Sequence, residues 1–284
     1  MTELDNTLVA ARHVAERDTA HTQERNRLWW EQMPMTYVDW NKADRALRTP
    51  EDYRRLPEYV LSLGPFLTAW FAAHDFTGQR VLDLGCGSGV FSSLLARKGG
   101  QVAAIDLTEA GVKMAAEVTA AQKVEVAIAR MDAEKLAFRD AVFDFVYSWG
   151  VLHHTGNMDA SIGELARILR PGGRGMMMVY HRDSVVYYGL GLFWLLAKGK
   201  IFRGHSLRTA TDFYTDGYYH RYLTRAELAR LLARHGLAVT RTHVTQYRKP
   251  ILPFLPASLD TWLKARFGMC LVAEFEKPAA RINV

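Results

Sequence analysis

A short apolar run that leads directly into a cluster of glycines constrains the fold of this chain most. The stretch VLDLGCGSG, residues 81–89, places Gly85, Gly87 and Gly89 behind four residues of strand character. This arrangement is typical of a parallel strand that turns into a helix and holds a ligand at the turn. Val90 stands where a dinucleotide-binding turn has its third glycine, so the spacing fits a nicotinamide cofactor poorly.

Segments of strand and helix character alternate from Val81 onward. Strands are expected at 81–84, 102–107, 124–131, 143–149, 175–180, 238–244 and 269–276, and helices at about 89–97, 110–121, 160–169 and 224–236. This alternation predicts an α/β fold, in which a seven-stranded, mostly parallel sheet carries helices on both faces. We expect Pro171–Gly173 to end the third helix, and Thr224 with Glu227 to form a capping box for the fourth.

The 284 residues suffice for one large α/β domain with appendages. Residues 1–60 are polar and helix-prone, yet several aromatic side chains gather around Pro34, which predicts an N-terminal helical cap rather than a disordered tail. Residues 61–284 are expected to form the main domain. An insertion at about 181–222, rich in Tyr, His and Arg, is expected to form a lid.

Composition limits the partners and the compartment. The formal charge of +6 is spread along the chain without Lys/Arg blocks, so no nucleic acid is expected as a partner. Cys86 and Cys270 form no disulfide framework and no leader is visible, which indicates the cytoplasm.

The apolar run 185–197 ends at Lys198 and is too short to cross a bilayer. It predicts either a buried or lid helix, or a membrane-surface contact that receives a lipophilic substrate.

Acidic residues at the ends of successive strands indicate the ligand. Asp83 precedes the glycines, where a carboxylate can accept hydrogen bonds from an ammonium group or from ordered water. The backbone N–H groups of the turn suit a small anion such as a carboxylate. A ligand with both groups is an amino acid, which fits the methionyl end of S-adenosylmethionine. Asp106 can take both ribose hydroxyls, as in an NAD site, and Asp132 can accept the adenine amino group.

Five motifs, taken in sequence order, resemble those of class I S-adenosylmethionine-dependent methyltransferases. They are VLDLGCGSG, IDLT, MDAEKLAF, FDFVYSWGVLHHT and LRPGG. The branch is that typified by quinone C-methyltransferases and natural-product tailoring enzymes. The resemblance covers about residues 78–180 and implies a Rossmann-like fold with S-adenosylmethionine as cofactor and no metal. The cofactor contacts predicted within the motifs are Asp83, Gly85, Cys86, Gly87, Gly89, Asp106, Leu107, Asp132, Ala133, Ser148, Trp149 and Gly150.

The fold is shared by many functions, so the acceptor must be sought in the segments that flank the motifs. A general base helps methyl transfer only if the acceptor begins protonated, and His154 and His181 are the candidates for it. Tyr37 is expected to cover the methionine group of the cofactor. The candidate acceptor contacts are Tyr180, Arg182, Tyr187, Tyr214, Tyr218 and His220.

These features predict methyl transfer to a small, partly apolar or aromatic molecule. One alternative is an RNA or protein methyltransferase, and another is a catalytically silent S-adenosylmethionine-binding partner subunit. The stretch SWGVLH stands where an amino-group methyltransferase has Asn-Pro-Pro-aromatic, which argues against the first alternative. The intact motif set favours activity over the second. The acceptor, the methylated atom (N, O or C) and the oligomeric state stay open.

Overall fold

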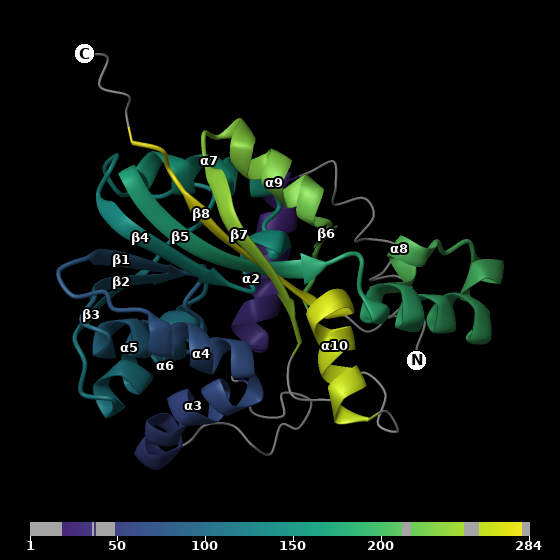
Figure 1. The fold of residues 1–284 in the computed structure, drawn as a ribbon, viewed down its shortest axis with the longest axis horizontal. Helices are drawn as coiled ribbons and strands as arrows, with labels where there is room; N and C mark the ends of the chain where they lie inside the picture. Colours follow the sequence, from purple (N-terminus) through teal and green to yellow (C-terminus); the bar gives the residue numbers. More distant parts are fainter. Residues whose placement is uncertain (1–18, 36, 38–48, 212–216, 247–255, 280–284) are drawn as a thin grey trace.

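The computed structural model describes residues 19–35, 37, 49–211, 217–246 and 256–279 (Figure 1). Seven strands form one sheet in the order β3-β2-β1-β4-β5-β8-β7. Their bounds are β1 (Arg80–Leu84), β2 (Gln101–Asp106), β3 (Val126–Arg130), β4 (Phe143–Trp149), β5 (Leu169–His181), β7 (Ala238–Thr245) and β8 (Cys270–Glu276). All neighbouring strands are parallel except β8, which runs antiparallel to β5 and β7. The predicted α/β fold is confirmed.

A short eighth strand, β6 (Tyr222–Leu223), was not anticipated. It pairs in parallel with Tyr180 and His181 at the carboxyl end of β5. The insertion expected at about 181–222 therefore leaves the sheet where β5 ends and returns to it at β6.

Helices cover both faces of the sheet (Figure 1). They are α2 (Thr19–Gln32), α3 (Pro50–Leu63), α4 (Pro65–Ala73), α5 (Val90–Arg97), α6 (Glu109–Ala121), α7 (Met158–Ile168), α8 (Leu207–Ala210), α9 (Arg225–Arg234) and α10 (Ala257–Phe267). Leu56 of α3, Trp70 of α4 and Leu95 of α5 belong to the buried cluster on one face. Ile162 of α7 and Leu231 of α9 belong to the cluster on the other. These two cores hold the strand ends in fixed positions.

The predicted capping box of α9 is confirmed, since the Thr224 hydroxyl accepts from Glu227 N and the Glu227 carboxylate accepts from Thr224 N. The helix α7 ends at Ile168, one residue before the predicted end and just ahead of Pro171–Gly173. The Pro-Gly-Gly stretch itself lies in the opening residues of β5, which was not expected. Gly172 N donates to Lys277 O, just beyond β8, so this stretch is hydrogen-bonded to the neighbouring chain segment of the sheet.

The N-terminal helices take two different positions. The boundary expected at residue 60 falls inside α3. This helix packs on α5 and α6 of the helix layer that covers the sheet. Tyr53 of α3 donates to Glu117 of α6 over 2.6 Å, and Glu58 of α3 lies 3.1 Å from Arg97 of α5. The helix α2 instead contacts the loops that follow the strands. The helix α2 therefore lies over the edge at which a ligand would bind, and α3 contributes Tyr59 and Leu63 of its last turns to the same cavity.

Candidate active site

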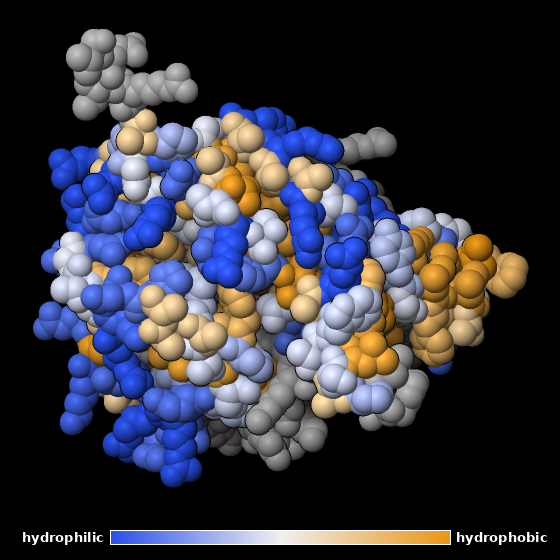
Figure 2. Space-filling view, viewed as in Figure 1, coloured by the Kyte–Doolittle hydropathy of each residue, from blue (hydrophilic) through white to orange (hydrophobic). Residues whose placement is uncertain are grey.

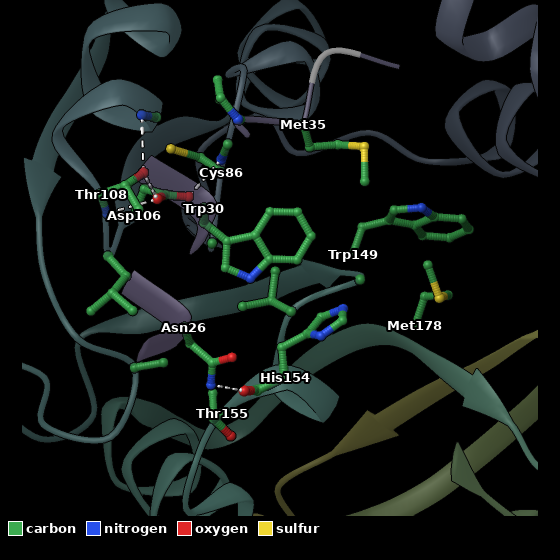
Figure 3. Close-up of a pocket in the computed structure, with 18 of the residues that line it drawn as sticks. Asn26, Trp30, Met35, Cys86, Asp106, Thr108, Trp149, His154, Thr155 and Met178 are labelled. Atoms are coloured by element: carbon green, nitrogen blue, oxygen red, sulfur yellow. Dashed lines mark hydrogen bonds between the residues drawn. The ribbon is translucent and has the colours of Figure 1, made fainter. Parts of the chain in front are cut away.

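A cavity of about 500 Å³ lies at the carboxyl ends of β1, β2, β4 and β5, and residues of α2 also line it (Figure 3). A crevice at this edge is the usual ligand site of an open α/β sheet. Eleven residues predicted to contact cofactor or acceptor line it: Tyr37, Gly85, Cys86, Gly87, Asp106, Leu107, Ala133, Trp149, Gly150, His154 and Tyr180. The motifs therefore converge on one cavity.

The glycine turn connects β1 to α5 and presents its backbone to the cavity. Gly85 N and Cys86 N both donate to Ile105 O over 2.8 Å, which fixes the turn against β2. Gly87 has a φ of 49°, and a Cβ at this residue would meet no atom within 4 Å. Since Gly87 also lines the cavity, the space beside its backbone is open for a ligand.

Asp106 ends β2 and faces the same turn (Figure 3). Its Oδ2 accepts from Gly87 N over 2.9 Å, and its Oδ1 accepts from Thr108 N and Thr108 Oγ1 over 2.9 and 2.7 Å. Burial raises the pKa of this carboxyl group, while the bonds from Thr108 and Gly87 act in the opposite direction. The side chain is thus held in place by its neighbours beside open space.

Asp83 lies beneath the glycine turn and does not line the cavity. It is 1% exposed, and its Oδ2 accepts from Ser92 Oγ over 2.6 Å. Burial raises its pKa to about 7, with the Ser92 hydrogen bond lowering it and the nearby charge of Asp106 raising it further. Its observed contact is therefore with the first turns of α5.

Three other residues predicted to bind the cofactor lie outside the lining. A Cβ at Gly89 would come within 2.6 Å of Ala115 Cα, so this glycine lets α5 and α6 approach closely. Asp132 accepts from Gln23 Nε2 over 2.8 Å and from Glu134 N over 2.9 Å. Ser148 is fully buried within β4. The geometry supports structural contacts for these three residues.

The helix α2 contributes residues that the sequence did not single out. Gln23 donates to Asp132 and accepts from Gly156 N over 3.1 Å, which joins the loops after β3 and β4. Asn26 Nδ2 donates to His154 O, and Asn26 Oδ1 accepts from Tyr219 N over 3.1 Å. Gln23, Asn26 and Trp30 line the cavity. Their spacing places them on one helix face, but spacing alone does not identify what that face contacts.

A fourth residue of α2, Glu31, binds the start of a helix of the sheet layer. Its two carboxylate oxygens accept from Glu109 N and Ala110 N of α6, over 3.0 and 2.9 Å. A negative charge at a helix N-terminus is favoured by the orphan N–H groups and by the helix dipole. The helix α2 is therefore fixed to the site at several points along its length.

His154 is the predicted base that lines the cavity. Its Nδ1 lies 2.8 Å from Tyr219 O, and because a carbonyl oxygen only accepts, Nδ1 carries the proton and Nε2 is the accepting nitrogen. Its ring meets Trp30 edge-on, with the ring centroids 5.2 Å apart (Figure 3). Burial lowers the pKa of this histidine to about 4, so the side chain is neutral near pH 7.

The cavity has a polar side and an apolar side. Figure 3 shows Asp106, Thr108 and Cys86 grouped on one side, and Met35, Trp149 and Met178 on the other, with the Trp30 ring between them. Further apolar lining comes from Tyr180 near the end of β5, from Val186 beyond that strand, and from Met269 just before β8. Methionine side chains adapt readily to the shape of an apolar or aromatic ligand.

His181, the other predicted base, does not line the cavity. Its backbone N donates to Met269 O over 2.7 Å, and its Nδ1 lies 3.1 Å from Gly268 O. Both of these hydrogen-bond partners of His181 are therefore backbone oxygens just before β8, and the residue is 2% exposed. The geometry gives no support for His181 as the base.

The remaining predicted acceptor contacts also lie off the lining. Arg182 forms an ion pair with Glu227 at 2.8 Å. Tyr187 packs on Tyr222 with ring centroids 4.9 Å apart, and Tyr218 is buried. His220 Nε2 lies 3.3 Å from a threonine hydroxyl, and its ring centroid is 6.3 Å from that of Tyr180, so it stands behind a lining residue. Tyr214 lies outside the described residues.

Comparison with known proteins identifies the shared region. Residues 82–177 match the family described as a methyltransferase domain. The ubiquinone biosynthesis O-methyltransferase of Alkalilimnicola ehrlichii is 33% identical over 122 residues, 42% of this chain and 49% of that protein. The enzyme of the same description from Xanthomonas oryzae pv. oryzae is 34% identical over 156 residues, 55% of this chain and 61% of that protein. The chain thus spans about half to three fifths of the length of these curated relatives.

A solved structure extends the similarity to the whole fold. The magnesium protoporphyrin IX methyltransferase (ChlM) of Synechocystis PCC 6803, with bound SAH, superposes with a TM-score of 0.56. The two sequences are 21% identical, and the alignment covers 88% of this chain and 97% of that chain.

Proposed function

We propose, from the premise that residues 82–177 belong to the methyltransferase domain family, that this chain transfers a methyl group from S-adenosylmethionine to a small, partly apolar or aromatic molecule. The family match agrees with the ordered motifs of the sequence. One observation carries the proposal: a single cavity joins the glycine turn and Asp106 to an apolar side and to His154. Cofactor and acceptor can therefore meet in one cavity.

The residues of the polar side fit S-adenosylmethionine. The open backbone at Gly87 leaves room for the ligand, the carboxylate of Asp106 lines the cavity and would accept from ribose hydroxyls, and Ala133, which also lines it, would contact the adenine. When bound, the cofactor supplies a methyl carbon activated by its sulfonium. The protein then has to position the acceptor and exclude water, and α2 covers the cavity for this purpose.

The apolar side fits an aromatic ring that carries a hydroxyl group. Met35, Trp149 and Met178 provide the ring contacts, and His154 Nε2 accepts a hydrogen bond from the hydroxyl. With S-adenosylmethionine held at Gly87 and Asp106, the acceptor oxygen would receive the methyl group in exchange for the hydroxyl proton, which would pass to His154 Nε2 or to water. Since the pKa of His154 is about 4, its main task is to orient the hydroxyl. The description of two relatives as O-methyltransferases supports an oxygen acceptor.

The test measures cofactor binding and methyl transfer on the full chain. Calorimetry with S-adenosylhomocysteine tests the cofactor site. Radiolabelled S-adenosylmethionine is then offered with hydroxylated aromatic compounds, with and without prenyl chains, and separately with total RNA and protein. We expect transfer to a small aromatic hydroxyl. Cofactor binding without any transfer supports the silent-subunit alternative, and efficient labelling of RNA or protein overturns the small-molecule assignment.

A matched pair of variants tests the role of His154. We expect His154→Gln to lower kcat at least tenfold and to leave the affinity for S-adenosylhomocysteine within twofold. His235→Gln is the control, since His235 lies at the end of α9 near Asp159 and away from the cavity. Equal kcat for both variants removes His154 from the mechanism.

No described helix is both long and apolar enough to pass through a membrane. Contact of residues 185–197 with a membrane surface, and location in the cytoplasm, stay predictions, as does the division into residues 1–60 and 61–284.

A further inference from the structure

An exposed apolar surface projects from one end of the molecule (Figure 2). It belongs to the insertion tip, defined here as residues 190–208, which contains one π-helical turn, η5 (Phe193–Ala197), and a 3-10 turn, η6 (Lys200–Arg203). Phe202 is 90% exposed and Leu196 is 56% exposed. The other exposed apolar side chains of the tip are Leu190, Leu192, Phe193 and Ile201. Contiguous apolar exposure of this kind marks an interaction surface.

The insertion tip has a defined internal structure. Leu195 and Lys200 are buried, so the segment has an inner side as well as an outer one. Gly199 and Gly204 close η6 at both ends with positive φ angles, and Ser206 caps the next helical turn. The exposed side chains are therefore presented outward by an ordered segment.

The charged residues of the insertion tip indicate which kind of partner its apolar surface would bind. The sequence from Ser184 to Thr211 contains no Asp or Glu. Lys198, Arg203 and Arg208 are exposed, and Lys198 Nζ lies 5.8 Å from the centroid of the Phe193 ring. Apolar side chains that reach into the acyl boundary, with cations beside them and no anions, are what the interface of an anionic bilayer attracts.

We propose that the insertion tip docks on the surface of a bilayer that contains anionic phospholipid. The projecting shape favours this partner over a second copy of the chain, because the apolar side chains stand on a protrusion rather than on a flat face (Figure 2).

The insertion tip is connected to the apolar side of the cavity, so docking on a membrane can serve the proposed reaction. Val186, the first residue of the π-helical turn η4 (Val186–Leu190), lines the cavity. The segment that carries the tip thus also contributes to the apolar side of the active site. Docking brings this side toward the lipid, so that a lipophilic acceptor passes from the bilayer into the cavity. This second statement rests on the proposed function, whereas docking itself does not.

Flotation with vesicles tests the docking. One set of vesicles contains phosphatidylcholine alone, and the other contains phosphatidylcholine with phosphatidylglycerol. We expect at least tenfold stronger binding to the anionic vesicles, with binding weakened by salt. Lys198→Glu with Arg203→Glu should weaken it by roughly fivefold or more per cation. Leu196→Ser with Phe202→Ser should abolish it, because the apolar contact is lost.

The control variant is Trp262→Ser, which removes a 55% exposed apolar side chain from α10, outside the tip. It should bind vesicles as the wild type does. Equal binding by the wild type and the tip variants overturns the proposal, as does an absence of binding to either vesicle. Self-association that Phe202→Ser removes, without vesicle binding, assigns the surface to a second copy and also overturns it.

Calorimetry with S-adenosylhomocysteine on the same proteins separates the two proposals. Cofactor binding without vesicle binding contradicts only the docking. Vesicle binding without cofactor binding contradicts only the proposed function. Unchanged cofactor affinity in the tip variants shows that they are folded.

Discussion

The three glycines of the turn after β1 meet three different requirements. A Cβ at Gly85 would collide with the side chain of Val151, and a Cβ at Gly89 would collide with the backbone of Ala115. A Cβ at Gly87 would meet no protein atom. The first two positions are restricted by packing within the protein, so of the three only Gly87 reserves space that the protein leaves open.

This contrast leads to a prediction for Gly87→Val, which should abolish the binding of S-adenosylhomocysteine while the protein stays folded. Gly236→Val is the control, because Gly236 also has a positive φ and open space around its Cβ but does not line the cavity. Both variants should lose about 1–2 kcal/mol of stability through backbone strain. Calorimetry and thermal unfolding measure the two effects. Normal cofactor binding by Gly87→Val would show that the open space is not the ligand site.

A second prediction concerns the buried carboxyl group of Asp83. Its pKa in the folded protein is raised to about 7, so burial of the charged form lowers stability as the pH rises toward 7. Between pH 5.5 and 7, we expect Asp83→Asn to gain roughly 2 kcal/mol relative to the wild type, on the order of 1.4 kcal/mol per pH unit. Urea unfolding at pH 5.5 and 8 measures the difference. A stability difference that does not change with pH contradicts the raised pKa.

At this scale the sequence predicted the residues that line the polar side of the cavity better than those that line its apolar side. Gly87 and Asp106 follow from local rules, because a strand end and a glycine spacing define where they point. His181 also follows a strand, but β8 pairs beside β5 and Gly268 O lies at its ring. Which strand lies next to β5 depends on the whole topology, so the position of this histidine could not be predicted locally.

At the scale of the element, α2 is the part of the site that sequence reasoning missed. Helix formation was expected in this region as part of an N-terminal cap. The hydrogen-bond partners of Gln23 and Asn26, however, lie more than a hundred residues away in the chain. No local pattern identifies such partners. The alternating strands and helices from β1 to α7, in contrast, were predicted nearly to their ends, because each has its own hydrophobic period.

The contacts of α2 lead to a third prediction, for Asn26→Ala. The variant leaves His154 O and Tyr219 N without their side-chain partner, which costs about 1–3 kcal/mol. We expect faster amide exchange over residues 19–32 and several-fold weaker binding of S-adenosylhomocysteine. Glu24→Ala is the control, because the described bonds of the Glu24 side chain are to Arg27 on the exposed face of the same helix. Similar exchange in both variants would show that Asn26 does not hold α2 in place.

At the scale of the whole molecule, the cavity joins segments from distant parts of the chain: α2, the ends of β1, β2, β4 and β5, and the start of the insertion. A ligand that contacts all of them stabilises the folded state as a unit. We therefore expect S-adenosylhomocysteine, at a hundred times its Kd, to stabilise the protein by about 2.7 kcal/mol, seen as a rise in Tm of several degrees.

Asp106→Ala is the matching variant. It should weaken ligand binding by about 2–3 kcal/mol, since charge-assisted hydrogen bonds to the ribose are lost. At the same ligand concentration its Tm should rise by less than a third of the wild-type shift. Differential scanning fluorimetry measures both proteins. An equal shift would move the ribose site away from β2.

On the proposed function, the attachment of α2 at Gln23, Asn26 and Glu31 should also limit how quickly S-adenosylhomocysteine is released after a turnover. We expect this helix, which is bound to the loops after β3 and β4 and to the start of α6, to detach when S-adenosylhomocysteine leaves. Detachment would break several hydrogen bonds at once, whereas the proposed methyl transfer within the cavity would need none of them to break. The first turnover should therefore appear as a rapid burst of about one methyl group per protein molecule, followed by a slower steady state set by the opening of α2.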